Sequence, residues 1–316
     1  MTGWDIIGDV HGCADKLSGL LNKLGYRKHD GAFRNSGRQA IFVGDLIDRG
    51  PDQVTTVDTV RAMVGAGSAQ MIMGNHEFNA IAYATRDPNS SSDYMRRHSK
   101  KNVRGHKFFI GQIGDTKRRD LIEWFKTLPL WLELDGVRIV HACWHDQSMA
   151  RLTAALDGHP MSEEFVVLSN TKGTPEFEAI EIVLKGPEFE LGQDRAFKVN
   201  DHVRTGARIR WWRPDARTLH EVADIPPDAK TPEGLCYPPL GDEPCAAADE
   251  YRYESAKPVV FGHYWRTGIP HIDGPRTACV DYSAVGGGDL VAYRWDGEET
   301  LVDTNFVAFG GTDSPG

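Results

Sequence analysis

The sequence predicts an α/β fold in which two mixed β-sheets pack face to face and are flanked by helices. In the first 80 residues, short apolar runs alternate with segments whose apolar residues recur at helical spacing, as in strand-helix-strand units of a parallel sheet. Later in the chain, Asp135-Gly136 and Asp296-Gly297 each give the strongest short signal for a β-hairpin. Parallel units followed by hairpins indicate mixed sheets that pack as a sandwich.

The N-terminal part alternates strands and helices. Strands are expected at Trp4–Ile7, Ala40–Val43 and Met71–Met73. Helices are expected over Cys13–Leu24, from Pro51 to the Gly65-Ala66-Gly67 terminator, and over Phe78–Tyr83. Each strand therefore leads into a turn and then a helix.

A further helix is expected over Asp120–Leu128, before Pro129. Two strands, Trp131–Leu134 and Val137–Val140, then follow, joined by the first Asp-Gly turn. A second hairpin is expected at Asp296-Gly297.

The stretch from about 146 to 256 has few long apolar runs and many prolines. We interpret the chain as a single domain over 1–316, with 146–256 as an insertion over the mouth of the site, where substrate choice is made. A separate domain is the alternative.

Composition excludes several classes of protein. The chain has 316 residues and a net charge of −9, from 45 acidic and 36 basic side chains. That balance argues against bulk nucleic-acid binding and against anionic membranes, since both favour a basic surface. No apolar run approaches 18 residues, and the N-terminus lacks a signal-peptide pattern. We therefore expect a cytoplasmic protein.

Three short strings carry most of the chemical information. They are Gly8-Asp9-Val10-His11-Gly12, Gly44-Asp45-Leu46-Ile47-Asp48-Arg49-Gly50 and Gly74-Asn75-His76-Glu77. One such string alone is typical of an ordinary turn. Each of the three, however, follows an expected strand, and together they place oxygen and imidazole groups at neighbouring strand ends. A hydrolytic divalent-metal site requires those groups.

These strings resemble the GDxHG, GDxxDRG and GNHE motifs of the calcineurin-like metallophosphoesterases. Two isolated histidines after later strands, His141 and His263, continue the resemblance. The full DRG and GNHE forms are similar to the PPP branch, which includes serine/threonine protein phosphatases and bacterial bis(nucleosyl)-tetraphosphatases. The resemblance implies the fold of that family and two divalent metal ions.

By this resemblance, Asp45 bridges the two ions. Asp9 and His11 match the ligands of one ion, and the second ion is matched by Asn75, His141 and His263. His145 competes with His141 for that role, but His141 directly follows the apolar run. Mn²⁺ is the expected metal, with Fe, Zn, Ni and Co as alternatives.

The resemblance also implies the chemistry. A metal-bridging hydroxide attacks phosphorus, and His76 protonates the leaving oxygen while Asp48 orients its ring. Arg49 matches the guanidinium that grips phosphate oxygens. The implied enzyme is a dinuclear-metal-dependent phosphohydrolase.

The substrate is less well defined. The segment Thr277–Tyr282 resembles the strand that closes the site in bacterial tetraphosphatases, which favours small phosphoesters or nucleoside polyphosphates. The alternative is a serine/threonine or tyrosine protein phosphatase acting on phosphoproteins. His141-Ala142-Cys143-Trp144 departs from the His-Gly-Gly string of the protein phosphatases. A non-catalytic scaffold is the third, remote reading.

Two patches are candidates for substrate contacts. Arg210 and Trp211 combine a guanidinium with aromatic surface suited to stacking a base, although packing of the tryptophan is the alternative. A basic run from Arg96 to Lys107 suits a polyphosphate, but a solvated helix face is the simpler and preferred explanation.

Overall fold

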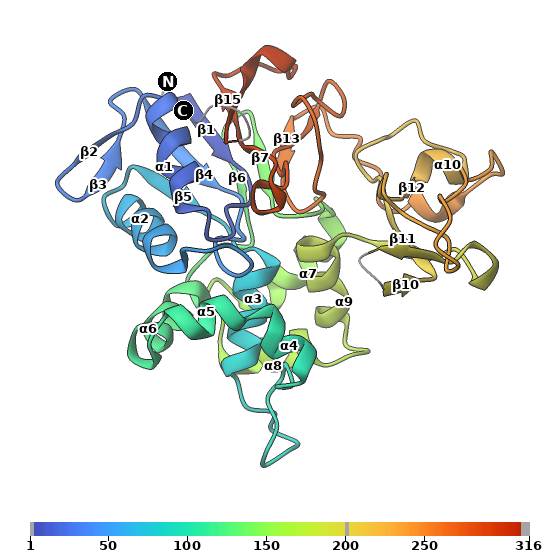
Figure 1. The fold of residues 1–316 in the computed structure, drawn as a ribbon, viewed down its shortest axis with the longest axis horizontal. Coiled ribbons are helices and arrows are strands. Elements are labelled where there is room, and N and C mark those ends of the chain that lie inside the picture. The colour runs from blue at the N-terminus through green and yellow to red at the C-terminus, as the bar shows by residue number, and fades with distance from the viewer. Residues whose placement is uncertain (1–2, 200–201, 311–316) are drawn as a thin grey trace. The chain divides into compact units, whose positions relative to one another are not determined.

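The computed structural model describes residues 3–199 and 202–310 and divides the chain into two compact units (Figure 1). The larger unit comprises the residues up to Lys185 together with those from Ala256, and the smaller unit comprises Gly186–Ser255. Within the described ranges, no helix has the length and apolar character needed to cross a membrane.

The larger unit contains most of the secondary structure. Its strands are β1 (Gly3–Ile7), β2 (Arg27–His29), β3 (Ala32–Arg34), β4 (Arg38–Phe42), β5 (Ala69–Met71), β6 (Trp131–Glu133), β7 (Arg138–Val140), β13 (Val259–Phe261), β14 (Thr277–Cys279), β15 (Leu290–Trp295) and β16 (Phe306–Phe309). Its α-helices are α1 (Ala14–Lys23), α2 (Gln53–Gly65), α3 (Asn75–Ala84), α4 (Lys100–Gly105), α5 (Lys107–Gln112), α6 (Asp115–Lys126), α7 (Asp146–Leu156), α8 (Glu163–Asn170) and α9 (Pro175–Lys185). Two 3₁₀ turns, η3 (Ala284–Gly286) and η4 (Asp303–Asn305), complete it.

Two mixed sheets form the centre of this unit. The five-stranded sheet has the order β16-β15-β1-β4-β5, with β1, β4 and β5 parallel and β15 and β16 antiparallel. The four-stranded sheet has the order β14-β13-β7-β6, with β14, β13 and β7 parallel and β6 antiparallel.

The two sheets share one hydrophobic core, which confirms the predicted sandwich. Ile6 and Ile41 of the first sheet belong to the same buried cluster as Ile139 and Val260 of the second. Helix α1 packs on β15 and β16, and α2 packs on β5. Burial of aliphatic side chains on this scale, about 1.5–3 kcal/mol for each, is what fixes the strand ends in space.

The smaller unit has its own strands and its own core. It contains β8 (Glu188–Glu190), β9 (Phe197–Val199), β10 (His202–Arg204), β11 (Gly206–Ile209), β12 (Ala223–Asp224), α10 (Leu219–Val222), η1 (Gln193–Arg195) and η2 (Ala246–Ala248). The sheet orders are β12-β11-β8 and β10-β9. Leu191, Phe197, Ala207 and Leu219 contribute to its core.

The smaller unit is shorter than the segment from 146 to 256, which is distinguished in the sequence by its composition. Helices α7, α8 and α9 lie in the larger unit, where α7 and α8 both pack against α9. The glutamates near 176–190 obscured α9 in the sequence, although this helix buries Ala179, Ile180, Val183 and Leu184. That this part of the chain covers the mouth of the site stays a prediction.

One of the two expected hairpins is confirmed. Strands β6 and β7 pair antiparallel around Gly136, which has a positive φ of 94°. The expectation for Asp296-Gly297 is wrong, because β15 pairs with β16 only after a connection from 296 to 305. Glu298 holds that connection by accepting hydrogen bonds from the Tyr293 hydroxyl and the Asn305 amide.

Candidate metal centre

The predicted metal donors all lie in the larger unit, just beyond the carboxyl ends of strands. Asp9 and His11 follow β1, and Asp45 follows β4. Asn75 begins α3 after β5, while His141 and His263 follow β7 and β13. The carboxyl ends of parallel strands are where α/β sheets hold their ligands.

The turns that carry these side chains are strained. Five site residues that are not glycine have a positive φ: His11 (45°), Asp45 (52°), Asp48 (70°), Arg49 (65°) and His263 (64°). Such backbone conformations cost about 1–3 kcal/mol each and persist only where the surrounding structure fixes them. Their concentration here is typical of a functional site.

Close contact between two turns explains the glycine at position 74. A Cβ atom on Gly74 would lie 2.2 Å from the backbone nitrogen of Asp45 and 2.3 Å from its Oδ1. Only glycine lets the second and third motifs touch at this point.

Asp45 lies at the centre of the cluster. The Nε2 atoms of His11 and His141 are each 3.5 Å from one of its carboxylate oxygens. The donor atoms of His11, Asp45 and His76 form one close group, and those of Asp45, His141 and His263 form another, with all distances inside each group within 4.8 Å. Asp45 is the member common to both groups, as a bridging ligand must be.

Backbone carbonyls set the orientation of two histidines. His11 Nδ1 lies 2.8 Å from the carbonyl oxygen of Ile47, and His141 Nδ1 lies 2.7 Å from that of Val43. Because a carbonyl only accepts hydrogen bonds, Nδ1 carries the proton in both rings. Each Nε2 is then left with its lone pair toward Asp45, as in metal-binding histidines.

The other predicted donors lie beside these groups. Asn75 Oδ1 is 3.1 Å from His141 Nε2, and Asp9 Oδ1 accepts a hydrogen bond of 3.4 Å from the backbone N–H of His263. Asp9 is not a member of either close group of donor atoms.

Buried negative charge also fits a metal centre. Burial, together with Asp281 and Asp45, raises the pKa of Asp9 well above its usual range. Burial likewise raises the pKa of Asp281 to about 6. Divalent cations are the charges that would keep such carboxylates ionised.

The His76 side chain has a different environment from the metal donors. Its Nδ1 is 2.7 Å from Asp48 Oδ2, and its Nε2 is 3.3 Å from the Nη2 of Arg49. Burial disfavours the charged ring, but Asp45 and Asp48 outweigh burial, so the pKa of His76 is raised. In contrast, the pKa of His11 is lowered to about 3, mainly by burial and to a smaller extent by the neighbouring His76.

The two rings thus have opposite preferences although their centroids are 4.7 Å apart. A neutral His11 is the form that binds a metal, and a protonated His76 is the form that donates a proton. Opposed pKa shifts in one site fit the predicted roles of His11 as a ligand and His76 as an acid.

Glu77 has a structural role that the sequence did not reveal. Its buried carboxylate accepts hydrogen bonds from the backbone N–H groups of Asp45 (2.8 Å), Leu46 (2.9 Å) and Gly74 (3.2 Å). It thereby fixes the second motif against the third. Its place at the end of the third string was the only signal for this role.

Two further side chains hold Asp48. Gln53 accepts from the backbone N–H of Asp48 (2.6 Å) and donates to the carbonyl of Gly50 (2.9 Å). His106 Nδ1 lies 2.7 Å from Asp48 Oδ2, the oxygen that also contacts His76. Nothing in the sequence around His106 indicated this contact.

Three expected candidates lie elsewhere. His145 Nδ1 is 2.8 Å from the Ser148 hydroxyl, and the ring belongs to neither donor group. Arg210 and Trp211 belong to the smaller unit, where Arg210 Nε is 3.2 Å from Asp224 Oδ1.

The expected aromatic surface at Trp211 is wrong. Trp211 is fully buried, and its ring packs against those of Trp212 and Tyr253, each with a centroid 5.9 Å away. A ring without exposed surface has no free face on which a base could stack.

Glu77→Gln is expected to weaken metal binding about 10–100-fold, because the new amide group would point a donor at backbone donors and loosen the turn that carries Asp45. Mn²⁺ titration by calorimetry measures this loss. Glu123→Gln, at an exposed position of α6, serves as the matched control. An affinity equal to that of the wild type would refute the role given to Glu77.

Comparison with known proteins gives the family. A sequence profile described as calcineurin-like phosphoesterase matches residues 5–263. The symmetrical bis(5'-nucleosyl)-tetraphosphatase of Janthinobacterium sp. (strain Marseille) is 30% identical over 305 residues, covering 93% of each chain. The asymmetrical bis(5'-nucleosyl)-tetraphosphatase PrpE of Oceanobacillus iheyensis is 33% identical over 140 residues, or 44% of this chain and 54% of that one.

The fold is also found among solved structures. The crystal structure of a candidate diadenosine tetraphosphatase aligns with a TM-score of 0.50 and 19% identity, covering 99% of this chain and 96% of that one. This likeness supports the fold alone. From the profile match and the full-length relative, the chain belongs to the calcineurin-like phosphoesterases, a family of metal-dependent phosphate-ester hydrolases.

Proposed function

We propose that this phosphoesterase hydrolyses the polyphosphate bridge of dinucleoside polyphosphates at a centre of two divalent ions. The position of Asp45 between two groups of donors, beside the His76–Asp48 pair, carries this proposal. Asp9 and His11 would hold one ion, while Asn75, His141 and His263 would hold the other, with Asp45 shared.

The choice of substrate draws on the full-length relative. The Janthinobacterium protein is named as a symmetrical bis(5'-nucleosyl)-tetraphosphatase, and its match covers 93% of each chain. We infer the same class of substrate here. Symmetrical cleavage of a tetraphosphate bridge releases two nucleoside diphosphates.

The metal ions, when bound, would lower the pKa of a water molecule and offset charge on the phosphate. Mn²⁺ is the proposed metal, since oxygen and imidazole donors without thiolate suit it, as they suit Fe, Zn, Ni and Co. His11 and His141 would bind through Nε2, because their Nδ1 atoms are held by backbone carbonyls.

The protein's own groups complete the reaction. Arg49, whose guanidinium lies 3.3 Å from His76, would hold the phosphate oxygens in a bidentate contact. His76 would transfer a proton from Nε2 to the leaving oxygen, while Asp48 holds Nδ1 and favours the charged ring. No side chain needs to form a covalent bond to phosphorus.

The part of the chain from 146 to 256 is proposed to shape the substrate pocket. The cytoplasmic location also stays a prediction from the sequence.

His76→Ala is expected to lower kcat by about 10²–10⁴-fold and to keep the bound metal, because a general acid contributes to rate and not to metal binding. The loss is expected to be larger for substrates with poor leaving groups. Asn75→Ala is the companion variant and should lose metal and activity together. Metal analysis and kinetics on both variants test whether His76 serves in proton transfer and Asn75 in metal binding. An unchanged rate for His76→Ala would exclude His76 as the general acid.

Chelation is expected to abolish activity and to lower the melting temperature, because buried carboxylates such as Asp9 then lack a neutralising charge. Mn²⁺ added back should restore both. Differential scanning fluorimetry follows the melting temperature, and chromatography of the ADP formed from diadenosine tetraphosphate follows the activity. A melting temperature that does not respond to EDTA or Mn²⁺ would show that no ion is bound to the folded state.

The substrate proposal is tested with diadenosine tetraphosphate, p-nitrophenyl phosphate and a phosphopeptide panel, all with Mn²⁺-loaded protein. Diadenosine tetraphosphate is expected to be cleaved fastest, with ADP as the nucleotide product by chromatography. ATP with AMP would mean asymmetrical cleavage. Faster turnover of phosphopeptides would make the protein a protein phosphatase.

A further inference from the structure

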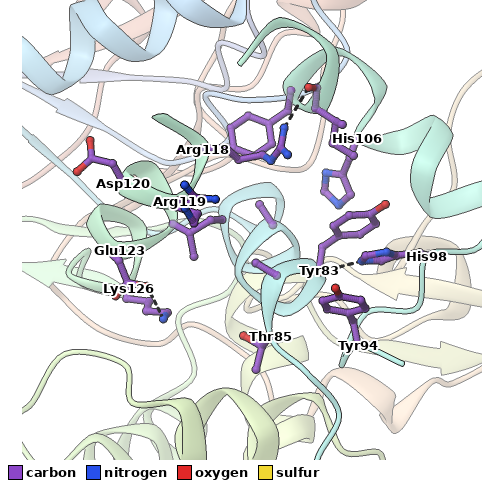
Figure 2. A pocket seen from close by; sticks show the side chains of 15 residues that line it. Tyr83, Thr85, Tyr94, His98, His106, Arg118, Arg119, Asp120, Glu123 and Lys126 are labelled. Atoms are coloured by element: carbon purple, nitrogen blue, oxygen red, sulfur yellow. Dashed lines mark hydrogen bonds and ion pairs between the residues drawn. The ribbon is translucent and has the colours of Figure 1, made fainter. Parts of the chain in front are cut away.

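A cavity lies in the larger unit between α3, α5 and α6. Its volume is about 640 Å³, within the range of small-molecule sites, and none of the predicted metal donors lines it (Figure 2). The lining combines aromatic and aliphatic side chains with a few charged groups.

A stack of three rings forms one wall of this cavity. The His98 ring is stacked between Tyr83 and Tyr94, with centroid distances of 3.8 and 4.0 Å (Figure 2). A contact of 2.9 Å between His98 Nε2 and the Tyr83 carbonyl oxygen fixes the central ring. Phe109 and Ile122 add apolar surface.

His98 is covered on both faces, and the Arg86 guanidinium lies over Tyr94, 4.2 Å from its ring centroid. The wall therefore offers ring edges and apolar surface, not a free ring face, to a planar ligand group.

The rim provides positive charge. Arg118 is held by the carbonyl oxygens of Ile110 (3.1 Å) and Ile113 (3.0 Å), and Lys126 pairs with Glu123 (2.8 Å). Arg119 has no acidic partner among the described residues, and its hydrogen-bond contact is to the Thr116 hydroxyl at 3.5 Å.

The acidic groups of the lining are already neutralised. Asp120 is paired with Arg61, which lies outside the lining, and Glu123 is paired with Lys126. The Arg119 guanidinium is therefore available to an anionic group.

His106 forms the inner wall. Its side chain is 4% exposed, and its ring points toward that of Tyr83, with the ring centroids 5.3 Å apart (Figure 2). Nε2 is buried and has no hydrogen-bond partner within the described part of the chain. An unsatisfied buried nitrogen costs about 1–3 kcal/mol, which a ligand group in the cavity would relieve.

His106 also connects the cavity to His76. One oxygen of Asp48 is 2.7 Å from Nδ1 of His106 and 2.7 Å from Nδ1 of His76. The other nitrogen of His76 faces Arg49 and Asp45. The cavity thus lies behind Asp48, on the side of His76 remote from the metal donors, and it is not a subsite for the reacting phosphate.

We propose that this cavity is a regulatory site for a nucleoside monophosphate, whose base lies against the aromatic wall and whose phosphate binds Arg119. Contact with His106 would change how firmly Asp48 holds His76, and so change the rate of proton transfer. Binding is independent of the proposed function, whereas the effect on rate rests on it.

The binding test is calorimetry with AMP on the Mn²⁺-loaded protein. Two binding events are expected, one at the metal centre and one in the cavity. Arg119→Ala should weaken only the second, by at least tenfold, and Arg104→Ala, an exposed arginine of α4 outside the lining, should change neither. Ala84→Trp, at an exposed lining position, should fill the cavity and abolish the second event.

Adenosine and inorganic phosphate, titrated separately, should each bind the cavity more weakly than AMP. Phosphate binding as tightly as AMP would overturn the base contact, and adenosine binding as tightly would overturn the Arg119 contact. A single AMP event, unchanged in Arg119→Ala and Ala84→Trp, would overturn the site.

The effect on rate is tested with phenyl phosphate and p-nitrophenyl phosphate. AMP at the metal centre competes with substrate and raises KM, so the cavity effect must appear in kcat. Phenolate is a poorer leaving group than p-nitrophenolate and depends more on protonation. We therefore expect AMP to change kcat more for phenyl phosphate than for p-nitrophenyl phosphate, and only when Arg119 is present. Equal kcat values with and without AMP would overturn the link to His76. Absence of hydrolysis of diadenosine tetraphosphate as well as of both aryl phosphates would count against the proposed function, while the AMP titrations still test binding in the cavity.

Discussion

Glu77 holds two turns together through backbone N–H groups, and the placement of Asp45 beside Asn75 and His76 in the candidate metal centre depends on that contact. The turn after β4 carries Asp45, and the turn after β5 carries Asn75 and His76. Both are strained or closely packed, and the buried Glu77 carboxylate satisfies donors from each. The two packed sheets hold the strand ends rigidly, so the turns that follow the strands keep their strained backbone conformations.

The group that contacts Nδ1 distinguishes the histidines of this site from one another. His11 and His141 are directed by carbonyl oxygens and present Nε2 to Asp45. His76 is instead directed by a carboxylate, which favours its protonated form. Neighbouring rings of the same residue type therefore differ in what each Nδ1 contacts, and this difference matches their proposed roles as ligand and as acid.

Much of this could be predicted from the sequence, because glycine-flanked motifs after apolar runs are local signals. The strand ends, the first hairpin and the grouping of Asp45 with His11 follow from such signals, whereas His141 is predicted from the family resemblance. Contacts between distant segments leave no local signal, so the roles of His106 and Gln53 appear only in the structure. Burial is equally invisible, so the sequence left open whether Trp211 stacks a base or packs in the interior, and the structure shows that it packs.

The central claim is that Asp45 is shared by two metal ions. A crystal structure of the Mn²⁺-loaded protein, with anomalous data collected at the manganese edge, tests this claim most directly. We predict two anomalous peaks, both within coordination distance of the Asp45 carboxylate. A single peak, or two peaks that do not share Asp45, would contradict it.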